Sequence, residues 1–200
     1  MKVAILDYGA GNLHSLAKVV SRSGVIASVE TDLRLAAAAD ALILPGVGAF
    51  GSAVEAVDRD REYATAAIAN GLPVLGICLG MQLLMDESEE GPGRGLGVVP
   101  GRVRKLRSSR VPQIGWNELE SADDKLFERS HLSTAYFANS FVCEPADANC
   151  VIAWATHDDD RFVAAMRVGR TVGVQFHPEK SSAEGVAFVQ AFLEEAGECR

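Results

Sequence analysis

The sequence lacks the features that define several large classes of protein. No apolar run is long enough to cross a membrane, and the amino-terminal run Lys2–Leu6 is too short for the core of a signal peptide. The net charge is −8 at pH 7, whereas nucleic-acid-binding domains usually carry a basic surface. The densest group of basic residues, 102–110, is expected to be a solvated strand or loop face. These absences predict a soluble, cytoplasmic protein that binds neither nucleic acid nor membrane.

Cysteine pairs with the CxxC spacing of metal or redox sites are also missing. Cys143 and Cys150 could form a bridge, but two free thiols are the simpler interpretation, and Cys199 is expected to be incidental. We therefore expect no metal site and no cofactor.

Repeats, linkers and low-complexity tracts are absent, so residues 1–200 are expected to form a single domain. In the first half, short apolar runs alternate with segments of helical periodicity. The expected strands are residues 2–6, 25–29, 41–44 and 73–77, and the expected helices are residues 13–22, 33–38 and 52–70. This alternation predicts an α/β fold, with a mostly parallel central sheet and helices on both faces.

The second half is expected to add short β pieces, among them a hairpin. They cover residues 98–99, 103–106, 136–142, 151–155, 162–167 and 172–176, with a hairpin turn at Gly169-Arg170. A final helix is expected from Ser182, where Ser181 and Glu184 have the spacing of a capping box.

The most informative stretch is Gly76-Ile77-Cys78-Leu79-Gly80, which joins an apolar run to the helix-like segment Met81–Met85. Strand, tight turn and helix in this order are typical of a nucleophile elbow, whose glycines let strand and helix approach closely. The amino end of the helix would direct N–H groups and its positive dipole end at the thiol, which favours the thiolate. Cys78 is therefore predicted to form a covalent thioester.

A cysteine nucleophile needs a base, and His177 is the best candidate. It follows the apolar run 172–176, and sites in parallel sheets lie at the carboxyl ends of strands. Glu179 can accept from the second ring nitrogen and fix the tautomer. A lone histidine is more often structural, but together with Cys78 these residues predict a catalytic triad. No catalytic role is expected for His14, His131 or His157.

An acyl-transfer site also needs donors for the oxyanion. The Leu79 N–H can supply one, and the turn Gly46-Val47-Gly48 can supply another, although a glycine turn alone is a weak signal. Gln82 lies one helical turn past Cys78 and can reach the same pocket, but an exposed polar residue is an equally good interpretation.

Together these motifs resemble the class I, or triad-type, glutamine amidotransferases, which have a flavodoxin-like fold. More narrowly, the chain resembles the glutaminase subunits of imidazole glycerol phosphate synthase, almost from end to end. The residues that carry this narrower resemblance are Asp7–Leu13, Pro45–Phe50, Gly115-Trp116-Asn117, Tyr136-Phe137 and Glu179-Lys180-Ser181. Gln113, Asn139 and Phe141 depart from it, because that family often has histidine, histidine and tyrosine at these positions.

The resemblance implies a role for each matching residue. Cys78 would attack the side-chain amide of glutamine, His177 would transfer protons, and Glu179 would orient His177. The implied oxyanion and substrate-binding residues are Gly46, Val47, Gly48, Leu79, Gln82, Ser140 and Phe141.

The resemblance also implies a partner, a (β/α)₈ cyclase subunit in a heterodimer. Ammonia would pass through that barrel to a phosphoribulosyl-formimino carboxamide nucleotide. The products would be imidazole glycerol phosphate and an aminoimidazole carboxamide ribonucleotide, in histidine biosynthesis. The interface candidates are Asn12, Trp116, Asn117, Tyr136, Phe137 and Lys180.

Two other interpretations stay open on the sequence alone. One is a glutaminase of the same class that serves another synthase, for purines, guanine nucleotides or pyridoxal phosphate, since the triad cannot separate these. The other is a non-catalytic binding module on the same fold, because fold alone does not settle function.

Overall fold

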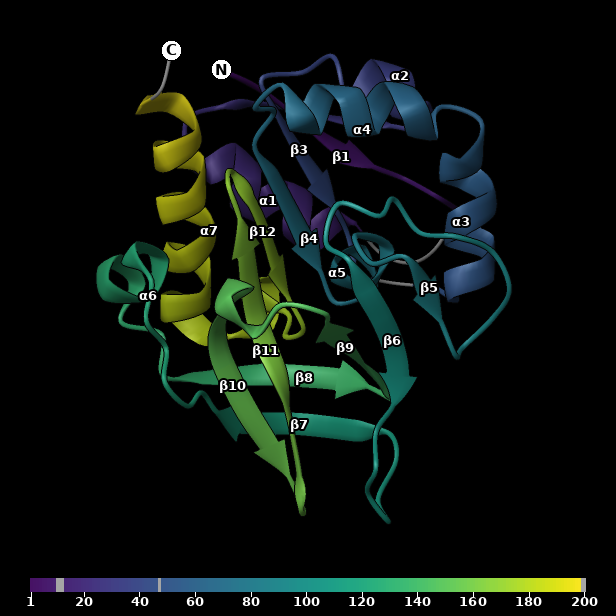
Figure 1. The fold of residues 1–200 in the computed structure, drawn as a ribbon. Helices are drawn as coiled ribbons and strands as arrows, with labels where there is room; N and C mark the ends of the chain where they lie inside the picture. The colour runs from purple at the N-terminus through teal and green to yellow at the C-terminus, as the bar shows by residue number, and fades with distance from the viewer. Residues whose placement is uncertain (10–12, 47, 199–200) are drawn as a thin grey trace.

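A computed structural model describes residues 1–9, 13–46 and 48–198. Its largest unit is a seven-stranded sheet with the strand order β10-β11-β12-β4-β3-β1-β2 (Figure 1). Its strands are β1 Lys2–Leu6, β2 Ile26–Glu30, β3 Ala41–Leu44, β4 Val74–Ile77, β10 Val151–His157, β11 Asp160–Val168 and β12 Thr171–Val174. The run from β12 to β2 is parallel, and antiparallel β11 and β10 extend one edge. This confirms the predicted α/β fold with a mostly parallel sheet.

Helices cover both faces of this sheet, because alternate strand residues face two different cores. Val3 and Ile5 belong to one core, and their neighbours Ala4 and Leu6 belong to the other. The first core includes residues of α1 His14–Arg22, α6 Lys125–Ser130 and α7 Ser182–Glu198. The second includes residues of α2 Leu33–Ala36, α3 Phe50–Asp58, α4 Arg61–Ala69 and α5 Leu79–Leu83. In Figure 1, α7 runs along one side of the strands and α3 lies on the other.

Two smaller sheets from the second half complete the architecture, as expected. One has three strands, β5 Glu87–Ser88, β6 Gly101–Lys105 and β9 Phe141–Pro145, and the other pairs β7 Gln113–Glu118 with β8 Thr134–Asn139. Backbone hydrogen bonds between Glu120 and Trp154 tie the segment after β7 to β10. Within the described residues, no helix has both the length and the apolar character needed to span a bilayer.

Several element predictions were wrong in detail. The helix expected over 52–70 is two helices, because the backbone at Asp60 leaves the helical region, with φ −113° and ψ 17°. The strand expected over 136–142 is interrupted at Ser140, where β8 ends and β9 begins. Residues 98–99 form no strand, and β5, β7 and α6 were not predicted.

The capping box expected at the start of α7 does not form. The Ser181 hydroxyl donates to the His177 carbonyl over 2.7 Å and accepts from the Tyr136 N–H over 2.9 Å. Ser181 is therefore used to hold the segment after β12 against β8, which positions His177.

The basic segment 102–110 is not simply a solvated face. Arg104 points inward from β6 and makes two hydrogen bonds, 2.7 and 2.8 Å long, to the buried carboxylate of Asp160. Its neighbours Arg102 and Arg110 pair with acidic residues at the surface. Arg102 and Arg104 are two residues apart and so share one face of β6, but only Arg104 is covered, where Asp160 of β11 pairs with it.

Candidate active site

Three neighbouring strands bring the predicted catalytic segments together. β3, β4 and β12 are adjacent in the sheet, and Gly46, Cys78 and His177 follow their carboxyl ends. A Cβ atom on Gly46 would lie 2.8 Å from Cys78 Cβ and 3.1 Å from His177 Cε1. The three segments are therefore in contact at one end of the sheet, where ligand sites of parallel sheets occur.

Cys78 lies on a strained turn between β4 and α5. Its backbone has φ 49° and ψ −104°, in the left-handed half of conformational space that non-glycine residues rarely adopt. The flanking glycines are required by packing: a Cβ on Gly76 would lie 2.7 Å from the Gly80 carbonyl oxygen, and one on Gly80 would lie 2.0 Å from that of Leu44. This is the geometry expected for a nucleophile elbow.

His177 is buried between Cys78 and Glu179. Its Nδ1 lies 2.9 Å from Glu179 Oε1, and a short 3₁₀ helix, Pro178–Lys180, folds the glutamate back onto the ring. Burial lowers the pKa of His177, but the hydrogen bonds with Cys78 and Glu179 outweigh burial and raise it to about 9. These contacts favour the protonated imidazole, the form that can give a proton to a leaving group.

A cavity of about 320 Å³ opens beside these residues. It brings the nucleophile and His177 together with most of the expected substrate-binding residues. Its lining consists of Gly46, Gly48, Cys78, Leu79, Gln82, Glu90, Ala138, Asn139, Ser140, Phe141, His177 and Lys180. Val47, also expected here, lies outside the described residues.

Comparison with known proteins agrees with this geometry. The family model described as "Glutamine amidotransferase class-I" matches residues 4–196. The chain belongs to this family.

Two of the relatives of this amidotransferase are named imidazole glycerol phosphate synthase subunit HisH. The one from Methanothermobacter thermautotrophicus is 42% identical over 195 residues, covering 96% of this chain and 98% of the relative. The one from Microcystis aeruginosa is 40% identical over 205 residues, covering 96% and 95%.

Two solved structures share the fold. A structure titled as a glutamine amidotransferase has a TM-score of 0.76 at 22% identity and covers 98% of both chains. The structure of PurLQS from Thermotoga maritima has a TM-score of 0.75 at 18% identity and covers 97% of this chain and 98% of that one.

Gln82 of this amidotransferase is a buried residue of the pocket, so the alternative of an exposed polar residue was wrong. Its Nε2 donates to the Phe141 carbonyl over 3.2 Å and to Gln175 Oε1 over 3.4 Å. Since both hydrogens of that nitrogen are used, the carbonyl oxygen Oε1 is the group left to bind a ligand.

Gln175 and Glu90 were not among the predicted site residues. Gln175 is fully buried behind the pocket, and its Nε2 lies 3.5 Å from Cys78 Sγ. Glu90 lies in the acidic segment 86–90, which reads as an ordinary surface loop. Its Oε2 accepts from the Phe50 N–H over 3.3 Å, and burial raises the pKa of the carboxyl. A carboxylate here places a negative charge in the pocket.

Tyr8 holds the loop that follows β3. Its buried hydroxyl donates to the Pro45 carbonyl, next to Gly46. Burial and then the charges of Cys78 and Asp7 raise the pKa of Tyr8 well above its usual range, so the phenol stays a neutral donor. No local sequence pattern predicted this contact between the segments that follow β1 and β3.

Three interface candidates form a surface cluster near the pocket. Trp116 is 57% exposed and packs edge-on against Tyr136, with ring centroids 6.2 Å apart. Lys180 lines the pocket, and its Nζ lies 5.8 Å from the centroid of the Tyr136 ring. Asn12 lies outside the described residues.

The interface prediction was wrong for Phe137, which is fully buried and packs edge-on against Phe162 and Phe176. Adjacent strand residues face opposite sides, so Tyr136 and Phe137 cannot share one surface. Asn117 is half-buried, and its Nδ2 donates to the Thr156 carbonyl over 2.8 Å.

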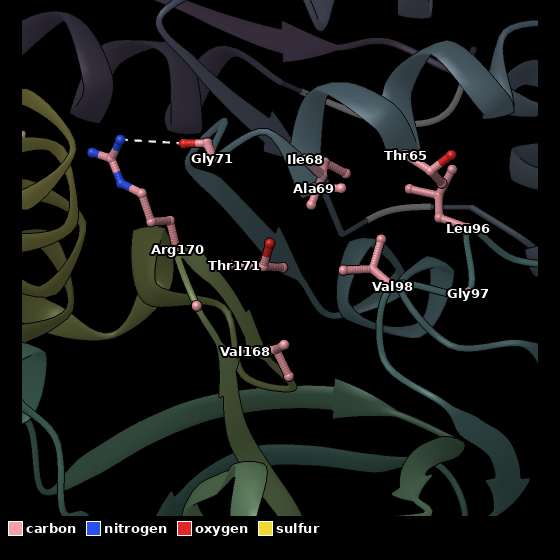
Figure 2. A pocket seen from close by; sticks show the side chains of 11 residues that line it. Thr65, Ile68, Ala69, Gly71, Leu96, Gly97, Val98, Val168, Arg170 and Thr171 are labelled. Atoms are coloured by element: carbon pink, nitrogen blue, oxygen red, sulfur yellow. Dashed lines mark hydrogen bonds between the residues drawn. The ribbon is translucent and has the colours of Figure 1, made fainter. Parts of the chain in front are cut away.

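A second cavity, of about 670 Å³, lies away from this site (Figure 2). It opens near Gly71 and Thr171, at the amino ends of β4 and β12, whereas Cys78 follows the carboxyl end of β4. The Arg170 guanidinium is turned to the carbonyls of Gly71 and Ala196, over 3.2 and 2.9 Å. The cavity contains none of the triad residues and is not the catalytic pocket.

Neither a candidate metal site nor a disulfide is found in residues 1–9, 13–46 and 48–198. No group of three or more His, Cys, Asp or Glu side chains there could hold a metal ion. Cys78, Cys143 and Cys150 are free thiols, and burial raises the pKa of Cys143 well above its usual range, so this thiol is a poor nucleophile.

Proposed function

We propose that the chain is the glutaminase subunit of an imidazole glycerol phosphate synthase, which hydrolyses glutamine to glutamate and ammonia. One observation carries the proposal: Cys78, on a strained elbow, lines the same pocket as His177, and Glu179 holds the His177 ring through Nδ1. The choice of synthase rests on the relatives at 42% and 40% identity, which are named as subunits of imidazole glycerol phosphate synthase.

The proposed reaction has two steps. Cys78 Sγ attacks the amide carbon of glutamine, and the protonated His177 gives its proton to the nitrogen as ammonia leaves, which produces a γ-glutamyl thioester. A water molecule then attacks the thioester, His177 accepts its proton, and glutamate leaves as the thiolate is restored. Glu179 keeps the imidazole in place through Nδ1 in both steps.

The oxyanion of each tetrahedral intermediate needs nearby N–H donors. Leu79 follows the nucleophile and begins α5, so its N–H is one of the unpaired donors of that helix. Gly46, Val47 and Gly48 complete the proposed oxyanion loop, in which Gly48 has φ 124° and so uses backbone conformation that only glycine adopts readily.

The pocket also offers groups for the amino-acid end of glutamine. The Glu90 carboxylate and the free Gln82 oxygen are acceptors, which suits an α-ammonium group. The backbone at Ser140 and Phe141 is proposed to hold the α-carboxylate, as the family resemblance implies.

The proposed partner is a (β/α)₈ cyclase subunit in a heterodimer. Ammonia would pass to it for the synthesis of imidazole glycerol phosphate and the aminoimidazole carboxamide ribonucleotide, a step of histidine biosynthesis. An exposed cluster of Trp116, Tyr136 and Lys180 beside the catalytic pocket supports docking on this face. Asn12 and Asn117 stay interface predictions.

The other interpretations are less well supported. Relatives named for a different synthase would be expected if the chain served purine, guanine-nucleotide or pyridoxal phosphate synthesis, whereas the relatives compared above carry the imidazole glycerol phosphate synthase name. A non-catalytic module would not need a strained cysteine beside a buried histidine–glutamate pair.

We also infer a single amidotransferase domain over residues 1–200, supported by the family match over 4–196. A cytoplasmic location is part of the proposal too, and the free thiols of the described cysteines suit a reducing compartment.

Reconstitution with the barrel subunit tests the proposal. Cys78→Ala should abolish glutamine-dependent synthesis while added ammonia still supports the cyclase. Cys150→Ala is the matched control, because this thiol lies outside the pocket and should leave both activities unchanged. Glutamine-dependent turnover that persists in Cys78→Ala would overturn the assignment.

A partner could also gate the reaction. We infer that the glycines of the loop 45–48 permit a peptide rearrangement that aligns the oxyanion donors only when the partner and its nucleotide are bound. Large stimulation of glutamine hydrolysis by partner plus nucleotide is expected, and equal rates for the free subunit would contradict this inference.

A further inference from the structure

Gln175 lies beside the nucleophile without a role in the triad. It follows β12, its side chain is fully buried, and its N–H donates to the Ala164 carbonyl over 2.8 Å. The neighbouring Val174 carbonyl accepts the Cys78 N–H over 2.7 Å, so the two residues are fixed by adjacent backbone contacts. A buried carboxamide at this position has to satisfy its polar atoms within the site.

The hydrogen bonds around Gln175 determine which end of its carboxamide faces the sulfur. The Phe141 carbonyl can only accept, so Gln82 has to present Nε2 to it. The same Nε2 lies 3.4 Å from Gln175, which therefore has to present its oxygen. The Gln175 nitrogen is left to point at Cys78 Sγ, 3.5 Å away. A flipped Gln175 amide would place two donors against each other.

We propose that Gln175 is a catalytic residue that donates a hydrogen bond to the Cys78 sulfur and stabilises its thiolate form. An N–H donor favours the charged form of the atom that accepts from it, and the effect is stronger in a buried site. An amide does not titrate, so it supplies this donor whether His177 has kept or given up its proton. The same bond would stabilise the sulfur when it leaves from the thioester.

The chain of amides also connects the sulfur to the substrate pocket. Gln82 binds Gln175 through its nitrogen and faces the pocket with its oxygen, where the proposed function places the α-ammonium group. Displacement of Gln82 would therefore change the orientation of the Gln175 donor.

The rate of Cys78 alkylation by iodoacetamide as a function of pH tests the role of Gln175. The full chain is used, and peptide mass spectrometry separates Cys78 from the other thiols. Gln175→Leu removes the donor, and Gln175→Glu keeps the shape but presents only acceptors at neutral pH. Gln175→Leu should raise the pH midpoint of Cys78 alkylation by about one unit. Gln175→Glu should raise it further, since its negative charge opposes the thiolate.

Gln113→Leu is the matched control, because Gln113 is a similarly buried amide, 4% exposed, for which no hydrogen bond to the sulfur is found. Its alkylation midpoint should equal that of the parent. Within the complex, the Gln175 variants should lose about tenfold in kcat for glutamine hydrolysis and keep ammonia-dependent synthesis.

Only the hydrolysis readout rests on the proposed function, since alkylation needs neither glutamine nor partner. Midpoints that stay at the parental pH in both Gln175 variants, or that move equally in Gln113→Leu, would overturn the role of Gln175. If Gln175→Leu fails to fold, Gln175→Met, which has a similar shape, no charge and no donor, decides the question.

Discussion

Gly46→Ala is expected to damage the active site more than the fold. The new methyl carbon would lie 2.8 Å from Cys78 Cβ and 2.7 Å from the Ile77 carbonyl oxygen. Carbon atoms prefer separations of about 3.5–4.0 Å, so relief requires a shift of roughly 1 Å. A displacement of that size at a reacting group costs about 10²-fold in rate. Overpacking of this kind should lower the free energy of unfolding by only about 1–3 kcal/mol.

The assay compares glutamine-dependent with ammonia-dependent synthesis in the reconstituted complex. Gly46→Ala should lose about two orders of magnitude in the first and keep the second. Gly51→Ala is the matched control: a Cβ there meets no atom within 4 Å, and the residue lies in α3. This control should keep full activity and gain roughly 0.5 kcal/mol in stability.

The reasoning would be refuted if Gly46→Ala retained parental glutamine-dependent turnover. That result would mean that the loop after β3 moves away from Cys78 at little cost, and that the contact does not set the geometry of the nucleophile. A loss of both activities, with an unfolded circular dichroism spectrum, would place the effect on folding instead.

Four further substitutions test the electrostatics and packing of the site. Asp160→Asn removes the charge that accepts the two shortest hydrogen bonds of the buried Arg104 guanidinium, which keeps a longer contact with Glu144, so urea titration at pH 7 should show a loss of roughly 2 kcal/mol. Burial raises the Asp160 pKa, but hydrogen bonds from its arginine lower it overall; the difference from the parent should therefore be full above about pH 4 and disappear as the pH falls through the lowered pKa. Glu179→Gln should move the NMR titration midpoint of His177 down from about 9. Because that pKa is raised, the stabilisation by His177 is full below about pH 6.5 and is lost as the pH rises through 9. Urea titrations should show a smaller loss in Glu179→Gln than in the parent, since the contribution of Cys78 remains. Tyr8→Phe should cost about 1 kcal/mol in urea titration and lower kcat for glutamine hydrolysis. Glu90→Gln should raise KM for glutamine about tenfold with kcat nearly unchanged in steady-state assays.

The parts of the site that could be predicted from the sequence are those set by local sterics and strand order. The turn around Cys78 has no room for a Cβ atom at Gly76 or Gly80. This need for glycine can be recognised from the five consecutive residues 76–80 alone. Strand ends meet at one edge of a parallel sheet, so Cys78 and His177 could be placed together without a structure.

Contacts between distant segments could not be predicted in the same way. Gln175 comes next to Cys78 only through the packing of β12, and Glu90 reaches the pocket only through the packing of the segment after β5. Neither residue has a local signal of that role. Two adjacent aromatic residues, Tyr136 and Phe137, were treated alike because the register of β8 was unknown. The break at Asp60 was missed because the charged run 58–62 contains no glycine or proline to mark the end of a helix.

Mass spectrometry of the acid-quenched complex during glutamine turnover tests the central claim most directly. The peptide that contains Cys78 should carry a γ-glutamyl adduct, which Cys78→Ala should lack. An unmodified Cys78 peptide, in a complex that releases ammonia from glutamine at its full rate, would contradict the account.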